Sequence, residues 1–215
     1  MARLTTLQRT QLNNMNVAAQ RGTLGTRLDA LEFGNVTTPA AGTVTSLAAV
    51  SYSTTPAVGT ATYVHAAIAQ TDATQTITTS ITNPDFPRIV TVKGNASGNS
   101  GDVVITGTDI NNAVLTDTIA LNGASEVLGV KAFKTVVSIG LPVEVHAGTD
   151  TVSVGVGNKI GFPVAILNAS SVIVKTFDGA VDASTITVGA TAAASLAAVA
   201  GTFNGTKIYT LVFLT

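Results

Sequence analysis

The residue types that most often carry catalysis are few in this 215-residue chain. There is no cysteine, which excludes a thiolate nucleophile, a disulfide and any Cys-ligated zinc or iron–sulfur site. The two histidines, His65 and His146, stand far apart, and we expect neither to pair at helical spacing with a carboxylate or with a second histidine. We therefore interpret both as ordinary strand or surface residues. No Gly-x-Ser-x-Gly nucleophile motif occurs, so the sequence predicts no enzyme and no cofactor.

One glycine-rich run resembles a loop that cradles phosphate, Gly155-Val-Gly-Asn-Lys-Ile-Gly161. Its glycine spacing differs from that of nucleotide-binding loops, and Phe162-Pro163 follow it directly. The run therefore does not open a helix, and the helix N-terminus that would hold the phosphate is missing. We therefore reject a phosphate site in this segment.

The carboxylates do not cluster either. Asp102 and Asp109 flank one expected strand, and Asp178 and Asp182 lie close together further along the chain. Neither pair has the Asp-x-Asp-x-Asp-Gly regularity of a calcium loop. A calcium ion held by loops that are distant in sequence is left open by this pattern.

Charge and aromatic content argue against several kinds of partner. The formal net charge is −1, whereas proteins that neutralise nucleic-acid phosphates carry a basic surplus. No apolar stretch reaches the roughly 20 residues of a membrane helix, and the first residues lack the apolar region of a secretory signal. Sugar-binding modules usually present aromatic platforms, but this chain has three tyrosines and no tryptophan. We expect neither nucleic-acid binding nor membrane insertion.

The most unusual property of the chain is how little of it is charged. Charged residues make up 11 % of the sequence, against about 25 % in a typical soluble domain. Threonine alone occurs 35 times. The surface must therefore be hydrated mainly by hydroxyl and amide groups, and a near-zero net charge favours association. This composition suggests a protein that works packed among neighbours.

The first 33 residues have a helical pattern and hold most of the arginine. Thr5-x-x-Gln8 matches a capping box, while Gly22 and Thr23 separate two short amphipathic helices. Four of the five arginines lie in residues 1–32, where two carboxylates leave a formal charge of +2. The segment is either a solvated helix face that caps the β domain or a docking arm for acidic groups of another protein. We favour the arm, with partner-binding residues Arg3, Leu4, Leu7, Arg9, Leu12, Arg21 and Arg27.

The rest of the chain reads as a connector and a β domain. Residues 34–61 are uncharged and rich in Thr, Ala, Gly and Pro, which is typical of an extended connector. Residues 62–215 contain short β-branched segments separated by Gly, Asn and Asp, the pattern of an antiparallel, jelly-roll-like β-sandwich. The expected strands are Thr62–Ala69, Gln75–Ile81, Arg88–Lys93, Asp102–Thr108, Ala113–Leu121, Ala132–Ile139, Thr151–Val156, Lys159–Phe162, Ser171–Phe177, Ser184–Val188 and Thr206–Leu214. The last of these is apolar on both faces near its end, so we expect it to be central in a sheet or covered by another subunit.

About half of the chain resembles a segment that recurs in structural proteins of tailed bacteriophages. The matching runs, in order, are Ile77-Thr-Thr-Ser-Ile-Thr-Asn-Pro-Asp-Phe-Pro-Arg88, Ile89-Val-Thr-Val-Lys-Gly94, Val103-Val-Ile-Thr-Gly-Thr-Asp109, Thr118-Ile-Ala-Leu121, Lys131-Ala-Phe-Lys-Thr-Val136, Gly155-Val-Gly-Asn-Lys-Ile-Gly-Phe-Pro163 and Phe177-Asp-Gly179. The resemblance implies a virion component of the head-decoration type, also called cement, auxiliary or head-fibre protein. Such proteins are commonly trimeric. The first 60 residues lie outside the resemblance.

These observations lead to three hypotheses about function. The first is a homotrimeric decoration protein on the outer surface of the capsid, which binds the major capsid protein and bridges neighbouring capsomers. The second is a tail or baseplate structural protein of the same virion. The third is an enzyme or a glycan-binding module, for which the sequence offers no convergent set of polar groups.

Overall fold

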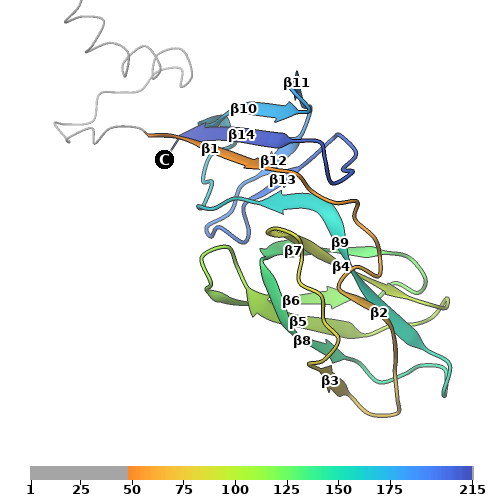
Figure 1. The fold of residues 1–215 in the computed structure, drawn as a ribbon. Helices are drawn as coiled ribbons and strands as arrows, with labels where there is room; N and C mark the ends of the chain where they lie inside the picture. The colour runs from red at the N-terminus through yellow and green to blue at the C-terminus, as the bar shows by residue number, and fades with distance from the viewer. Residues whose placement is uncertain (1–47, 215) are drawn as a thin grey trace, which may run out of the picture. The chain divides into compact units, whose positions relative to one another are not determined.

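The computed structural model describes residues 48–214, which belong to one compact unit of the chain. The predicted helical arm, residues 1–33, and the first part of the predicted connector lie outside the described residues. Within the described part, nearly all of the regular secondary structure is β-strand, and each strand pair is antiparallel. The prediction of a mainly β, antiparallel domain is therefore confirmed (Figure 1).

Three sheets make up the fold. The first sheet has the order β1 (Ala49–Thr54), β14 (Tyr209–Leu214), β10 (Val172–Phe177), β11 (Ala180–Val181). The second has the order β12 (Thr185–Thr187), β13 (Leu196–Ala198), β9 (Thr151–Gly161), β4 (Arg88–Gly94), β7 (Val127–Phe133), and β2 (His65–Ala69) also pairs with β9. The third has the order β3 (Gln75–Ile77), β8 (Thr135–Leu141), β5 (Asp102–Thr108), β6 (Val114–Ala120). A single short 3-10 turn, Ala169–Ser171, precedes β10 among these residues.

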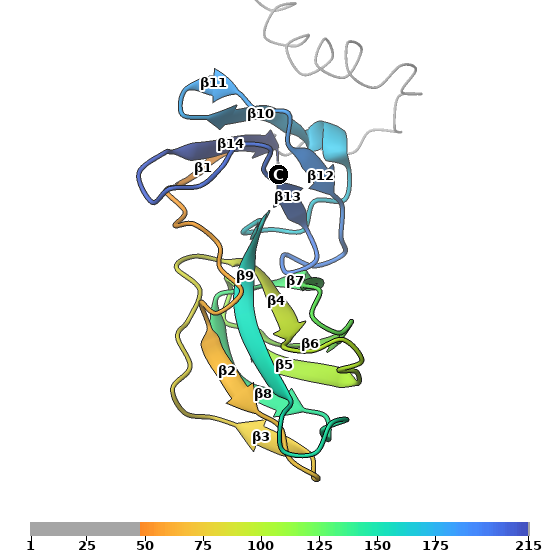
Figure 2. The same cartoon turned by 90° about the vertical axis from the view of Figure 1, so that its right-hand side faces the viewer.

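The long strand β9 joins the parts of this unit (Figure 2). It pairs with β4 from Val152 to Ile160, whereas β2 pairs with its first residues and β13 with its last. Two hydrophobic clusters lie on either side of this change of partners. One fills the space between the second and third sheets, with β-branched residues such as Val90, Val103 and Ile105 fully buried. The other packs beneath the first sheet and centres on the aromatic rings of Phe162, Phe203 and Phe213.

Glycines inside β9 allow neighbouring segments to approach its backbone closely. A Cβ atom at Gly155 would collide with the carbonyl oxygen of Thr60, and one at Gly157 would lie 2.8 Å from Cδ1 of Ile89. The run Gly155–Gly161 lies within strand β9 and does not open a helix. Here glycine is needed for packing, because a side chain would occupy the space that its neighbours fill.

A buried carboxylate closes the gap between the second and third sheets. Asp117 of β6 is 4 % exposed, and its Oδ2 accepts hydrogen bonds from the backbone N–H groups of Val130 (2.8 Å) and Lys131 (3.3 Å) on β7. The Lys131 ammonium in turn donates to the carbonyl oxygen of Thr116 on β6. The second and third sheets together form a half-barrel. Between β6 and β7, on one side of this half-barrel, side-chain hydrogen bonds take the place of a strand ladder. Gly129 leaves room for the carboxylate, since a Cβ there would lie 2.6 Å from Oδ2 of Asp117.

The predicted strands differ from the observed ones at identifiable places. Ala132–Ile139 was expected as one strand, but the chain changes sheets at Lys134, between β7 and β8. Conversely, the two strands expected within residues 151–162 are continuous in β9. Strand β13 lies in the alanine-rich stretch 190–200, which has no alternating pattern.

Both ends of the described chain meet in the first sheet. Residues 49–54, placed in the predicted connector, form β1 and pair with β14 along their whole length. The last strand, β14, is central in its sheet, between β1 and β10. This is the first of the two positions predicted for it, central in a sheet or covered by another subunit. Its inward residues Tyr209, Leu211 and Phe213 are fully buried.

Candidate functional site

The residues predicted to bind a partner all lie outside the described part of the chain. Arg3, Leu4, Leu7, Arg9, Leu12, Arg21 and Arg27 precede residue 48, so their assignment stays a prediction. The described body instead offers two buried polar centres, shallow surface hollows and exposed sheet faces. We consider each for what it can do chemically.

The first polar centre is the buried guanidinium of Arg88, at the start of β4. Arg88 is 0 % exposed, and its Nε donates to the carbonyl oxygen of Gly157 at 2.7 Å. Its Nη1 donates to the carbonyl oxygen of Ala57 at 3.0 Å and to Oδ1 of Asp85 at 3.1 Å. The other carboxylate oxygen of Asp85 accepts the backbone N–H of Ala57 at 2.7 Å. Arg88 and Asp85 therefore tie the segment after β1 to β4 and β9.

Aromatic rings complete the surroundings of this cation. The guanidinium carbon lies 5.3 Å from the ring centre of Phe86 and 5.4 Å from that of Phe203, within the range of cation–π attraction. Burial lowers the pKa of Arg88, whereas the neighbouring Asp85 carboxylate acts in the opposite direction. With its polar atoms enclosed, Arg88 is suited to holding chain segments together rather than to contacting a solute. The sequence signal was the pair of bends, Asn83-Pro84 and Phe86-Pro87, that set the entry of β4.

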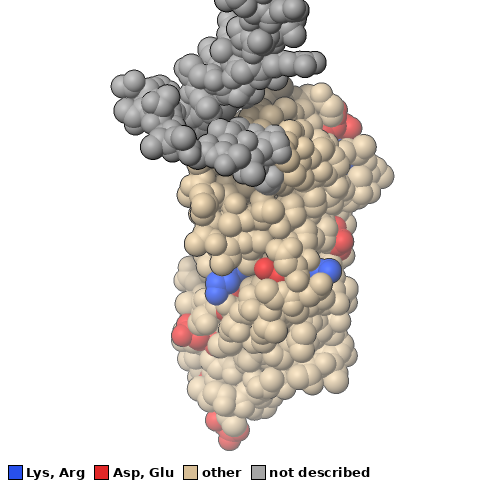
Figure 3. Space-filling model, turned by 90° about the vertical axis from the view of Figure 1, so that its left-hand side faces the viewer, with Lys and Arg blue, Asp and Glu red and all other residues tan. Residues whose placement is uncertain are grey.

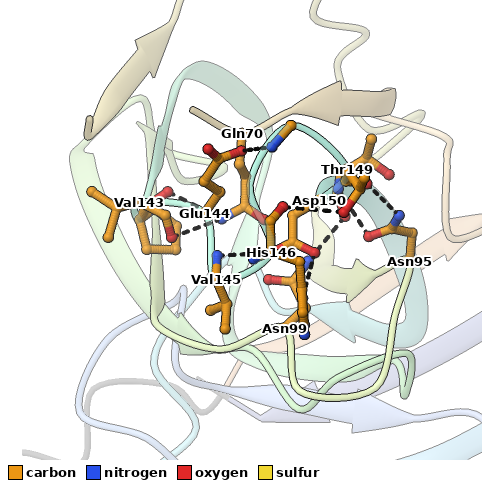
Figure 4. A network of polar contacts seen from close by, with 12 residues as sticks. Gln70, Asn95, Asn99, Val143, Glu144, Val145, His146, Thr149 and Asp150 are labelled. Atoms are coloured by element: carbon orange, nitrogen blue, oxygen red, sulfur yellow. Dashed lines mark hydrogen bonds and ion pairs between the residues drawn. The ribbon is translucent and has the colours of Figure 1, made fainter. Parts of the chain in front are cut away.

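The second polar centre is the Asp150 carboxylate, which organises the turn between β8 and β9 (Figure 4). Asp150 is 1 % exposed. Its Oδ2 accepts backbone N–H groups of Val145 (2.7 Å) and His146 (2.8 Å), and its Oδ1 lies 2.9 Å from Nδ1 of the His146 ring. Burial opposes the charged carboxylate, but these hydrogen bonds prevail and lower the pKa of Asp150.

This pair corrects our account of His146. His146 and Asp150 are four residues apart, so our statement that neither histidine stands at helical spacing from a carboxylate was wrong; the two side chains pair across a turn. A side-chain to backbone turn motif, with an Asp accepting from residues four and five positions before it, would have indicated the contact. The surrounding polar groups, among them Gln70, Asn95 and Asn99, bond mainly to backbone atoms and so fix loops in place.

Two of the carboxylates considered as metal ligands, Asp109 and Asp182, accept hydrogen bonds from the backbone. Asp109 accepts the N–H groups of Asn111 and Ala113 within a turn. Asp182 accepts N–H groups of Ser184, Ala200 and Gly201, which holds the loop before β14. Within residues 48–214 no three His, Asp or Glu side chains come together in a way that could hold a metal ion. Nor does any helix in that range have the length and apolar character needed to cross a membrane.

A shallow hollow of about 350 Å³ lies beside the middle of β9. Its walls come from four segments: Val58–Gly59, Glu126 and Leu128, Val156–Asn158 and Ala200–Phe203. Glu126 is the one charged residue that lines it. A nucleophile, a general base and an oxyanion-binding group are not brought together there, so its geometry supports no particular reaction.

The outer sheet faces are the most distinctive surfaces of the described body. On the third sheet, Val104 stands between Thr118 and Gly140, and Thr106 stands between Thr116 and Ser138. On the first sheet, Val212 stands between Ser51 and Val174. These rows contain hydroxyl and small apolar side chains and no charge. Figure 3 shows the same sparseness on one face of the molecule, where a few acidic and basic groups are scattered over an uncharged surface.

Comparison with known proteins identifies no relative of this chain. No protein-family model, no curated protein and no solved structure matches it. Function must therefore be argued from the residues and surfaces themselves.

Proposed function

We propose that this chain is a structural virion protein of a tailed bacteriophage, of the head-decoration type. In this proposal it lies on the outer surface of the capsid, binds the major capsid protein and bridges neighbouring capsomers. The observation that carries the proposal is the pair of sheet faces with uncharged central rows of Thr, Ser and Val, on a body with few charges. Such faces can pack against a large partner without desolvating ions. The resemblance of residues 77–179 to phage structural segments supports the same class.

The proposed mechanism is stabilisation by binding. A protein that binds only the assembled shell stabilises it by mass action, by about 4 kcal/mol when its free concentration is 1,000 times Kd. In this scheme the leucines of residues 1–33 bury apolar area against the shell, while the four arginines pair with acidic groups there. The β body then spans the boundary between capsomers.

Two finer features belong to the proposal. We assign the body to the jelly-roll-like β-sandwiches, because apolar residues of facing antiparallel sheets form its cores. We also propose that the chain acts as a homotrimer, since proteins of the resembled type are commonly trimeric.

Co-sedimentation with capsids from which the protein has been removed tests the proposal. The full chain should sediment with the shells and raise their melting temperature. A chain lacking residues 1–33 should stay folded, because the described body starts after them, but should no longer sediment. A full-length control with Arg3, Arg9, Arg21 and Arg27 changed to Gln separates the contribution of charge from that of the leucines.

Two results would contradict parts of this proposal. Undiminished sedimentation of the truncated chain would rule out the docking arm. Antibody labelling of intact particles tests the position on the virion: signal on the head supports decoration, and signal on the tail or baseplate supports the alternative structural role.

A further inference from the structure

The edges of the sheets differ in how they are protected. An exposed strand edge presents unpaired backbone N–H and C=O groups, and proteins usually shorten, bend or cover it. In residues 48–214, β11 has two residues, and β3 and β12 have three each. Strand β2 contains an irregularity in its register between His65 and Ile68. The facing edges of β6 and β7 are joined by Asp117 and Lys131.

Strand β1 has none of these protections. It runs for six residues, Ala-Val-Ser-Tyr-Ser-Thr, in unbroken register with β14, and stands at the end of its sheet. It contains no charged residue, no proline and no bulge. Its second edge has no strand partner within the described chain. This edge is therefore suited to receive another strand.

The hydrophobic core beneath the first sheet is also incomplete at β1. The inward residues of central β14 are fully buried, whereas Val50 and Tyr52 pack against the same cluster and stay partly exposed. An additional strand beside β1 would cover these two side chains. Backbone pairing and burial of apolar side chains thus both favour a further strand beside β1.

We propose that β1 pairs antiparallel with β1 of a second copy of this chain across a two-fold axis. Antiparallel pairing about such an axis places same-face residues opposite each other, so Ser51 faces Ser51 or Ser53 of the second copy. The core-facing Val50 and Tyr52 then meet the corresponding residues of the other copy. The absence of charge in β1 favours this pairing, because a charged residue that stood opposite itself across the two-fold axis would meet an identical charge.

The role of this contact on the capsid rests on the proposed function. A two-fold contact joins one trimer to the next, so it would link neighbouring decoration trimers over the shell. A pair of strands buries far less than the roughly 1,200 Å² of a stable interface, so it is weak between free molecules. It becomes effective where many copies are held side by side, because the local concentration is then high.

Single cysteines test the pairing cleanly, because the chain has none of its own. Ser51→Cys and Ser53→Cys place thiols on the exposed side of β1, and Thr118→Cys on exposed β6 is the matched control. Opposite Cα atoms in an antiparallel pair lie about 4.5–5.5 Å apart, which a disulfide spans. Under mild oxidation at high protein concentration, either the Ser51→Cys chain alone or its equimolar mixture with the Ser53→Cys chain should yield covalent chain pairs several-fold faster than the control. Equal yields from both of these samples and the control would overturn the proposal.

Charge reversal provides a second, independent measurement. At high protein concentration, even weak β1 pairing should double the solution mass of part of the wild-type protein. Ser51→Lys with Ser53→Lys, and separately Ser51→Glu with Ser53→Glu, should each abolish this doubling. Mixing the two variants should restore it, since opposite charges then face each other. An unchanged mass distribution in the Lys variant, or a mixture that stays undoubled, contradicts β1 pairing. Capsid sedimentation separates the claims: pairing without capsid binding overturns the proposed function alone, and capsid binding without pairing overturns this inference alone.

Discussion

The two halves of the described body end their sheets in opposite ways. The half-barrel of the second and third sheets covers its long edges, with the Asp117 carboxylate and the Lys131 ammonium bridging β6 and β7. The first sheet leaves the six-residue edge of β1 open and its core partly exposed at Val50 and Tyr52. A sheet that is closed by side chains is complete within one chain. A sheet that ends in an unprotected strand is suited to assembly, and we expect the two halves to respond differently to substitution.

The largest effect is expected at Arg88, which lies where the two halves meet. Arg88→Met keeps much of the side-chain volume but leaves the carbonyl groups of Gly157 and Ala57 without their donor. We expect a loss of about 3–5 kcal/mol in the free energy of unfolding, the range for breaking a buried ion pair. Urea denaturation followed by circular dichroism measures it.

Arg88→Lys serves as the control for this change. It keeps a cation but cannot serve Gly157 and Ala57 with the same planar fork, so an intermediate loss is expected. If Arg88→Met unfolded at the wild-type urea concentration, the joining role of Arg88 would be wrong.

A smaller effect is expected at Asp117, within the closed half. Asp117→Ala removes the acceptor for two buried N–H groups of β7, at a cost of about 1–3 kcal/mol. Hydrogen exchange should then quicken at Val130 and Lys131 while the amides of β14 keep their protection. Asp117→Asn retains one acceptor oxygen, so its free energy of unfolding should lie between those of the wild type and Asp117→Ala. Equal loss of protection in β14 would show that the halves do not behave separately.

The smallest effect concerns acid stability and the Asp150 turn. In the folded protein the pKa of Asp150 lies below its ordinary value of 3.8. The free energy of unfolding that this carboxylate contributes is therefore fully present above about pH 4. That contribution is lost as the pH falls below 4 through the folded pKa, because the unfolded chain takes up the proton first. Asp150→Asn should therefore flatten the pH dependence of the melting temperature below pH 4. A profile identical to that of the wild type would contradict this role of Asp150.

Local patterns were sufficient for several strands. Asp102–Thr108 was expected as a strand and is strand β5 with the same bounds, because Val103 and Ile105 alternate with residues of the outer face. Alternation fails where both faces are buried or where residues are small. Strand β13, inside a run of alanines, is held in place by pairing with β9, which no local pattern records.

The polar centres show the same limit. Asp85 and Arg88 are three residues apart, yet the groups that complete their bonding come from Ala57 and Gly157. His146 and Asp150 are local partners, but a turn had to bring them together. Sequence separation hides the first centre, whereas the second has a local four-residue spacing that the sequence does show.

The sequence by itself determined the chemistry of this protein's surface: no thiol, few ions, abundant threonine, and arginine concentrated before residue 33. It also determined the class of fold, since the two-residue period of β-branched side chains is a local property of the chain. Only the tertiary structure decided which strand edges are closed and which is open. Strands β1 and β14 stand at opposite ends of the described sequence, and burial of a shared core brings them side by side. No local pattern of the sequence records such a contact.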